Sequence, residues 1–196
     1  MNILIYDTET TGLVNTKLPF TDPSQPRLVQ LAAALVDDSD WHPRAIMSFL
    51  ITGVEVPLDA FNVHHISTSL CTACGVKLSY ALHIFETLWS RAQEHWAYNA
   101  DYDIAILSGE LTRCDRQDFA NRLPMTRCLM RPLTDVCRLS GKYGKYKWPK
   151  LAEAYKHFFA EPPAEAHDAL ADVQTTARVL RAFKEMQPSE PTPHHD

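Results

Sequence analysis

The sequence contains no apolar run of 18 residues, and this absence excludes an obvious transmembrane helix. The N-terminal stretch also lacks the basic flank and small-residue cleavage site of a secretory signal peptide, because Asp7 and Glu9 interrupt its apolar residues. We therefore expect a soluble, cytoplasmic protein with no membrane partner.

Cysteine is scarce, with five residues at uneven spacing, which favours free thiols in a reducing compartment over a disulfide framework. Cys71 and Cys74 form a Cys-x-x-Cys pair close to His64 and His65, but no second cysteine pair follows at zinc-finger spacing. A zinc site is therefore the less favoured interpretation of this pair. The alternative is a short helix with buried thiols.

Positive charge is not in excess, since the formal net charge is −5. This argues against nonspecific coating of duplex nucleic acid, which depends on many contacts between basic side chains and phosphates. A nucleic-acid enzyme is not excluded, because a cluster of metal-binding acids contributes negative charge that bound cations offset.

Internal repeats and dividing linkers are absent from the 196 residues, so we expect one domain over residues 1–186 and a disordered, proline-rich tail over 187–196. Residues 14–27 are expected to form a loop and residues 56–67 to be irregular. Strand patterns cover residues 2–6, 28–36, 45–52, 96–99 and 128–130, and the first three predict an antiparallel meander. Helical patterns cover residues 78–92, 101–111, 133–139, 151–159 and 169–183. This order predicts an α/β fold with a mixed central sheet flanked by helices.

The first strand ends in two acids, within the segment Asp-Thr-Glu-Thr-Thr-Gly-Leu at residues 7–13. If the strand continues through Glu9, its period of two places Asp7 and Glu9 on one face, with Cα atoms roughly 6.7 Å apart. Like charges this close raise each other's pKa and destabilise the fold unless a cation lies between them. Oxygen ligands favour Mg²⁺ or Mn²⁺ over zinc. Taken alone, the pattern fits equally well a turn cap at Asp7 and a solvated Glu9.

A second group of polar residues, Asn99-Ala100-Asp101-Tyr102-Asp103, lies where a strand gives way to a helix. Asp103 is expected in the first turn of that helix. Helix N-termini favour acids, so by itself the segment predicts a capping role for Asp101 or Asp103.

A third group opens the last helix. Asp168 is a plausible N-cap, whereas Asp172 lies beside the apolar stripe, where an unpaired acid is unfavourable. His167 precedes Asp172 by five residues and is close enough in sequence to lie above it. We therefore expect Asp172 to have a partner.

In order and separation, these three groups resemble the three exonuclease motifs of the DEDD superfamily. The histidine, where other members have tyrosine, is similar to the DnaQ-like subgroup. The resemblance spans about residues 1–183 and includes the connecting residues 28–32, His64 and residues 147–151. It departs at His64-His65-Ile66, where the family often has His-Gly-Ile.

The resemblance implies an RNase H-like fold and a metal-dependent 3′–5′ exonuclease that releases nucleoside 5′-monophosphates. Asp7, Glu9, Asp103 and Asp172 would hold two Mg²⁺ or Mn²⁺ ions about 3.5–4 Å apart. His167 would accept the proton of the attacking water. The implied substrate is the 3′ end of single-stranded or frayed DNA, in proofreading or repair, with a polymerase or another replication protein as a candidate partner acting in trans.

The expected substrate contacts fall into two regions. Residues 142–150 interleave lysines with aromatics, and such a segment can bind phosphates and stack on unpaired bases. A solvated loop anchored to the core by its tryptophan is an equally good interpretation of that segment. The full set of candidate contacts is Thr8, Thr10, Gly12, Leu13, His64, Asn99, Tyr102, Lys147 and Trp148.

Two other functions stay open. One is an exoribonuclease that trims RNA 3′ ends by the same chemistry, since no residue pattern reports on a 2′-hydroxyl. The other is a catalytically idle nucleic-acid-binding or polymerase-accessory module with the same fold. The presence of all four acids and of His167 argues against the idle module.

Overall fold

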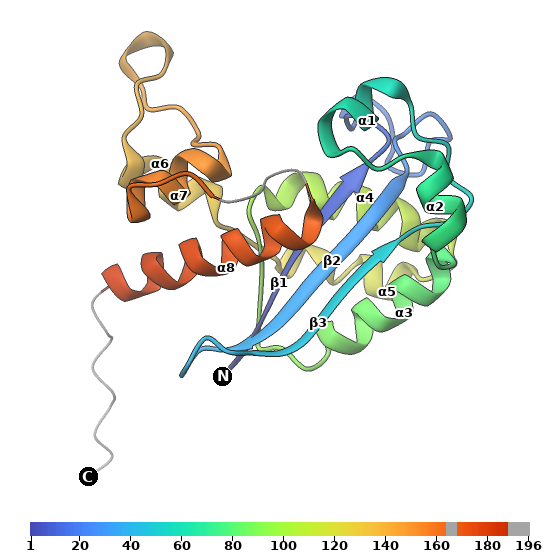
Figure 1. Ribbon diagram of the computed structural model, residues 1–196, viewed down its shortest axis with the longest axis horizontal. Coiled ribbons are helices and arrows are strands. Elements are labelled where there is room, and N and C mark those ends of the chain that lie inside the picture. Colours follow the sequence, from blue (N-terminus) through green and yellow to red (C-terminus); the bar gives the residue numbers. More distant parts are fainter. Residues whose placement is uncertain (164–167, 188–196) are drawn as a thin grey trace.

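A computed structural model describes residues 1–163 and 168–187, and within them the strands form one five-stranded mixed sheet in the order β3-β2-β1-β4-β5 (Figure 1). Strands β1 (Asn2–Thr10), β2 (Leu28–Asp37) and β3 (Pro43–Leu50) form an antiparallel meander. Strands β4 (Glu94–Ala97) and β5 (Arg127–Cys128) extend the sheet in parallel with β1. The predicted α/β class, the meander and the central place of β1 are confirmed.

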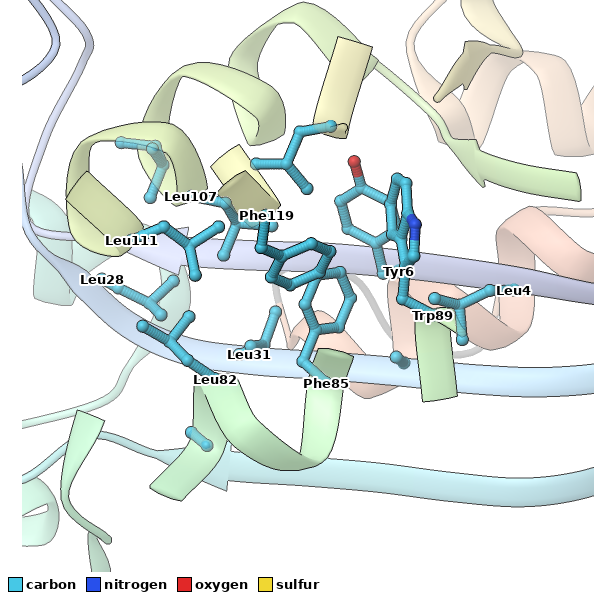
Figure 2. Close-up of a cluster of buried hydrophobic side chains, with 14 of the residues drawn as sticks. Leu4, Tyr6, Leu28, Leu31, Leu82, Phe85, Trp89, Leu107, Leu111 and Phe119 are labelled. Atoms are coloured by element: carbon cyan, nitrogen blue, oxygen red, sulfur yellow. The ribbon is translucent and has the colours of Figure 1, made fainter. Parts of the chain in front are cut away.

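Helices cover both faces of this sheet. Successive side chains of β1 point to opposite faces, and because both faces are buried the strand is almost continuously apolar. Leu4 and Tyr6 pack in a core with Phe85 and other residues of α3, α4 and α5 (Figure 2). Ile3 and Ile5 point to the opposite face and pack under α6, α7 and α8. The helices are α1 (Leu58–His64), α2 (Thr68–Cys74), α3 (Leu78–Trp89), α4 (Ala100–Arg113), α5 (Gln117–Ala120), α6 (Met130–Cys137), α7 (Leu151–Phe159) and α8 (Ala169–Met186), with short 3₁₀ turns at η1 (Leu123–Met125) and η2 (Lys142–Gly144).

Most element boundaries lie within a few residues of those predicted, and α7 has the predicted bounds. The prediction that residues 56–67 are irregular is wrong, because they contain α1. Pro57 suggests a break, yet it lies at the N-cap, where a missing N–H is tolerated because the first helical N–H groups have no partner within the helix. His65 ends α1 in the left-handed conformation, with a φ of 59°.

Residues 14–27 form the predicted loop, and buried polar contacts fix it against α4. The buried Gln25 side chain accepts a hydrogen bond from the Asn15 N–H and donates to the Asn15 carbonyl oxygen, at 3.0 and 2.8 Å. The Arg27 guanidinium donates to both carboxylate oxygens of Glu110 at 2.7 and 3.0 Å. Glu110 is 1% exposed, so its charge is compensated inside the protein. The loop is thereby tied to the helix that carries Asp103.

Among residues 1–163 and 168–187, no helix has both the length and the apolar character needed to cross a membrane. The tail predicted over residues 187–196 lies outside the described residues, apart from Gln187, which follows α8 directly.

Candidate active site

Three carboxylates meet at the end of β1. This strand continues to Thr10, so Asp7 and Glu9 lie on one face, and the first turn of α8 brings Asp172 beside them. One carboxylate oxygen from each of Asp7, Glu9 and Asp172 lies within 4.8 Å of the other two. The turn-cap interpretation of Asp7 is therefore wrong, because Asp7 lies inside a strand and Glu9 is half-buried. An all-oxygen donor set at this spacing fits a hard divalent cation.

Asp103 is the fourth predicted acid and lies in the first turn of α4, with only 3% of its surface exposed. Its Oδ1 accepts a 2.7 Å hydrogen bond from the Thr8 hydroxyl. Asn99 is the N-cap residue of α4, and its side chain makes no capping hydrogen bond. Asp101, in contrast, is exposed and pairs with Arg131. At the start of α4, Asp101 therefore forms a surface ion pair, whereas the carboxyl of Asp103 is buried and faces β1.

Burial and mutual repulsion raise the pKa of three carboxyls in this cluster. The pKa of Asp7 lies well above its usual range, chiefly through burial and then through the charges of Asp103 and Asp172. Burial, followed by the charge of Asp172, raises the pKa of Glu9 to about 8. Burial also raises the pKa of Asp103 to about 7, against the opposing effect of the hydrogen bond from Thr8. The cluster therefore retains protons near neutral pH unless a cation compensates its charge.

These raised pKa values predict that the metal-free protein loses stability as the pH rises. Each carboxyl binds its proton more tightly in the folded state than in the unfolded state, so the stability gained by protonation is complete at low pH and disappears as the pH passes through 7 to 8. In EDTA we expect the cluster to lower the Tm of the protein by roughly 4–8 °C between pH 5 and pH 8.5. This corresponds to a loss of about 2 kcal/mol in the free energy of unfolding.

The measurement is thermal unfolding of the wild type and of Glu9→Gln across that pH range, with and without Mg²⁺. Buried His95 has a lowered pKa, so its contribution to stability increases with pH, opposite to that of the cluster. The difference between the two proteins cancels this contribution. Glu9→Gln should show the shallower decline in EDTA, and saturating Mg²⁺ should flatten the wild-type curve. Identical slopes in the two proteins would contradict the repulsion between these acids.

The N-terminus of α8 is fixed by a glutamine from β2. Asp168 caps the helix as predicted, its Oδ1 accepting the N–H groups of Leu170 and Ala171 at 3.0 and 3.1 Å. Gln30 donates to the Asp168 Oδ2 at 2.9 Å and accepts the Ala169 N–H at 3.0 Å. Because Gln30 pairs with Glu9 across the antiparallel ladder, one bridge joins the strand that carries Glu9 to the helix that carries Asp172.

A cavity of about 570 Å³ opens beside Glu9, between the turn that follows β1 and helix α1. The hydroxyls of Thr10 and Tyr102 both donate hydrogen bonds to the Gly12 carbonyl oxygen, at 2.8 and 2.7 Å. These hydrogen bonds fix the conformation of the turn. His64 supports it from α1: its Nδ1 accepts the Ile66 N–H, so Nε2 carries the proton and faces the Thr10 carbonyl oxygen at 3.3 Å. A volume of this size is typical of pockets for small ligands.

Known proteins resemble this chain in sequence and in fold. A family model named RNase T and described as an exonuclease matches residues 4–180. The chain belongs to this exonuclease family. An uncharacterized exonuclease, CP81, of Escherichia phage 186 is 30% identical over 89 residues, which cover 44% of this chain and 46% of the phage protein.

Solved structures of exonuclease I share the fold of this RNase T family member. Escherichia coli exonuclease I in complex with a dA16 oligonucleotide superposes with a TM-score of 0.75 at 20% identity, covering 95% of this chain and 41% of that protein. Exonuclease I from Methylocaldum szegediense gives a TM-score of 0.70 at 22% identity, covering 96% of this chain and 41% of that protein. The predicted RNase H-like fold is confirmed, and the chain spans less than half the length of these relatives.

The residues predicted to contact substrate lie in four places in this exonuclease fold. The cavity is lined by Thr10, Gly12, Leu13, His64 and Tyr102. Thr8 lies on β1 with 6% of its surface exposed, and its hydroxyl donates a hydrogen bond to Asp103. Asn99 is exposed at the start of α4, and Lys147 and Trp148 lie on a separate hairpin. His167 falls outside the described residues.

Cys71 and Cys74 lie on α2, which confirms the predicted short helix. Only Cys71 is buried, whereas Cys74 is exposed, so the prediction that both thiols are buried is wrong in part. Within residues 1–163 and 168–187, the one group of histidines, cysteines and acids spaced to hold a metal is that of Asp7, Glu9 and Asp172.

Proposed function

We propose that this chain is a 3′–5′ exonuclease that uses two divalent cations, Mg²⁺ or Mn²⁺, to release nucleoside 5′-monophosphates from single-stranded or frayed DNA. The observation that carries the proposal is the convergence of three carboxylates beside a nucleotide-sized cavity. Membership of the exonuclease family supports it. The direction of cleavage rests on the resemblance of the motifs to those of DEDD exonucleases.

Each acid has a distinct part in the proposed site. Asp7, Glu9 and Asp172 offer oxygens close enough to share one cation, and Asp103, held by Thr8, adds a carboxylate from α4. Bound divalent cations would lower the pKa of a water and stabilise the departing 3′ oxygen. His167, directly before the α8 cap, would accept the proton of that water.

The cavity is the proposed site of the 3′-terminal nucleotide. Leu13 is 88% exposed at its rim, which leaves an apolar side chain free to pack on a base. Tyr102 and His64 keep the backbone of the turn at Thr10–Gly12 in one conformation, so the nucleotide meets a preformed surface. Single-stranded DNA is the preferred substrate in this proposal, in line with the dA16 and dT13 oligonucleotides bound to exonuclease I.

The test is digestion of four 5′-labelled 20-mers with Mg²⁺: single-stranded DNA, matched RNA, a duplex with a 3′ mismatch and a fully paired duplex. We expect shortening from the 3′ end in single-nucleotide steps, at least about tenfold faster on single-stranded DNA than on the paired duplex, because a paired end must fray first. EDTA should abolish the products. Chromatography should identify nucleoside 5′-monophosphates.

Other outcomes of the same digestion discriminate the alternatives. Faster degradation of RNA than of DNA would favour the exoribonuclease. Shortening from the 5′ end, or release of dinucleotides, would overturn the proposal. A protein that binds the oligonucleotides and yields no product with either Mg²⁺ or Mn²⁺ would be the idle binding module, acting as an accessory to a polymerase or another replication protein.

A further inference from the structure

Residues 139–149, which we call the lysine–aromatic hairpin, project beyond α6 and α7, away from the sheet (Figure 1). The hairpin is a closed structure. The Gly141 N–H donates to the Lys145 carbonyl oxygen at 2.9 Å, and the Lys147 N–H donates to the Leu139 carbonyl oxygen at 3.0 Å. A Cβ at position 141 would lie 2.6 Å from the Lys145 carbonyl oxygen, so glycine lets the two arms approach this closely.

The base of the hairpin is fixed next to the active site. Pro149 ends it, and the Pro149 carbonyl oxygen accepts a 2.8 Å hydrogen bond from the buried Tyr98 hydroxyl. Tyr98 follows β4 and precedes Asn99, the N-cap of the helix that carries Asp103. Because β4 is parallel to β1, both strands end at the edge of the sheet where the acids gather. The hairpin is thus anchored at the same edge as the cluster.

The side chains of the hairpin are positive and aromatic, in a protein whose formal net charge is −5. Residues 139–149 contain three lysines and no acid. Among the ion pairs of the described residues, Lys147 pairs with Glu153, and none involves Lys142 or Lys145. The aromatic rings face solvent: Tyr143 is 97% exposed and Trp148 65%.

The tip of the hairpin holds its tyrosine outward in an unfavourable backbone conformation. Tyr143 has a φ of 57°, followed by Gly144 at 72°. A left-handed conformation costs a residue other than glycine about 1–2 kcal/mol. A solvated loop gains nothing from this strain or from an exposed ring, whereas stacking on an unpaired base contributes about 1–3 kcal/mol per base.

We propose that the lysine–aromatic hairpin binds the single-stranded part of the substrate, 5′ of the nucleotides held in the active site. Lys142 and Lys145 pair with backbone phosphates while Tyr143 and Trp148 stack on bases. This inference rests on the proposed function and extends it: the hairpin makes the enzyme prefer long single strands over short oligonucleotides.

The test is binding of fluorescein-labelled dT20 and dT3 to the full chain in Ca²⁺ by fluorescence anisotropy. For Lys142→Glu/Lys145→Glu we expect dT20 affinity to fall about 10-fold at low salt. The salt-dependence slope should fall by about 1.4, or ~0.7 for each lost phosphate contact on a single strand. Affinity for dT3 should change less than twofold. Tyr143→Ala/Trp148→Ala should weaken dT20 binding about 10-fold with little change in salt slope.

The matched control is Lys17→Glu/Lys77→Glu, which makes the same change in charge at two exposed lysines outside the hairpin. It should leave the dT20 affinity within twofold of the wild type. Equal losses in the control and in the hairpin variant, unchanged affinity in the hairpin variants, or equal losses for dT3 and dT20 would each overturn the inference.

Hydrolysis separates this inference from the proposed function. If the wild type releases mononucleotides from dT20 and the hairpin variants bind dT20 as tightly as it does, the hairpin inference fails and the exonuclease proposal stands. If the wild type releases none and the hairpin variants still lose dT20 affinity selectively, the exonuclease proposal fails and the hairpin remains a single-strand binding surface.

Discussion

Replacing Asp7 with asparagine is expected to lower turnover in the proposed exonuclease reaction by at least about a thousandfold and to stabilise the metal-free protein. Asp7 is central to the cluster, since its pKa responds to the charges of Asp103, Asp172 and Glu9. Asparagine has a similar volume but one oxygen and no charge, so it weakens cation binding at the point shared by the other acids. Loss of about 4 kcal/mol of transition-state stabilisation corresponds to this thousandfold decrease.

The gain in stability has the same origin as the loss of activity. A half-buried carboxylate beside like charges destabilises the folded state, and a neutral side chain removes that repulsion. We expect the Tm of Asp7→Asn in EDTA to exceed that of the wild type by about 2–4 °C, or roughly 1 kcal/mol. Saturating Mg²⁺ should raise the Tm of the wild type more than that of the variant.

Turnover of single-stranded DNA and thermal unfolding with and without Mg²⁺ measure both effects. The matched control is Asp118→Asn, which removes an exposed carboxylate of α5 and should leave turnover and Tm unchanged. An Asp7→Asn protein that is inactive and also less stable in EDTA would indicate a folding defect. A variant with wild-type activity would refute the role of Asp7 in binding metal.

Local patterns in the sequence were sufficient to predict the meander, whereas the choice of the four acids as a site needed the resemblance of the three groups to the exonuclease motifs. The apolar run before Asp7 predicts a strand, and because the strand continues to Thr10 its period of two places Asp7 and Glu9 on one face. The structure adds that this strand is buried on both faces. The helical patterns fail only where a proline misleads, as at Pro57, or where a short segment such as α5 has too few residues to show a period.

The polar contacts that position the site could not be predicted from such patterns. Gln30 and Asp168 are 138 residues apart, and Arg27 and Glu110 are 83 apart. Hydrophobic periodicity reports which face of an element is buried, but it carries no information on which polar side chains meet across the fold. Glu110 is a partial exception: an acid on the buried face of a helix needs a charged partner, although the pattern does not say which residue that is.

Replacing His167 with alanine is expected to lower kcat on single-stranded DNA by about 100- to 1000-fold, within the range of roughly 100- to 10,000-fold that general acid–base catalysis contributes. His167 directly precedes Asp168, whose side chain caps α8 and is bonded to Gln30. The Asp168 cap and the Gln30 bridge remain in the variant, so Asp172 keeps its place. Mg²⁺ affinity, measured by calorimetry, should therefore change less than about threefold.

The pH dependence of kcat distinguishes a base from a residue that only supports the fold. If His167 accepts the proton, the wild-type rate should decline as the pH drops below the ordinary histidine pKa of about 6.5. The variant should lack that decline. The defect should also shrink toward pH 9, where hydroxide increasingly replaces the missing base. The matched control, His83→Ala at an exposed position of α3, should retain the wild-type profile. A constant defect at every pH, accompanied by weaker Mg²⁺ binding, would instead place His167 among the groups that organise the metal site.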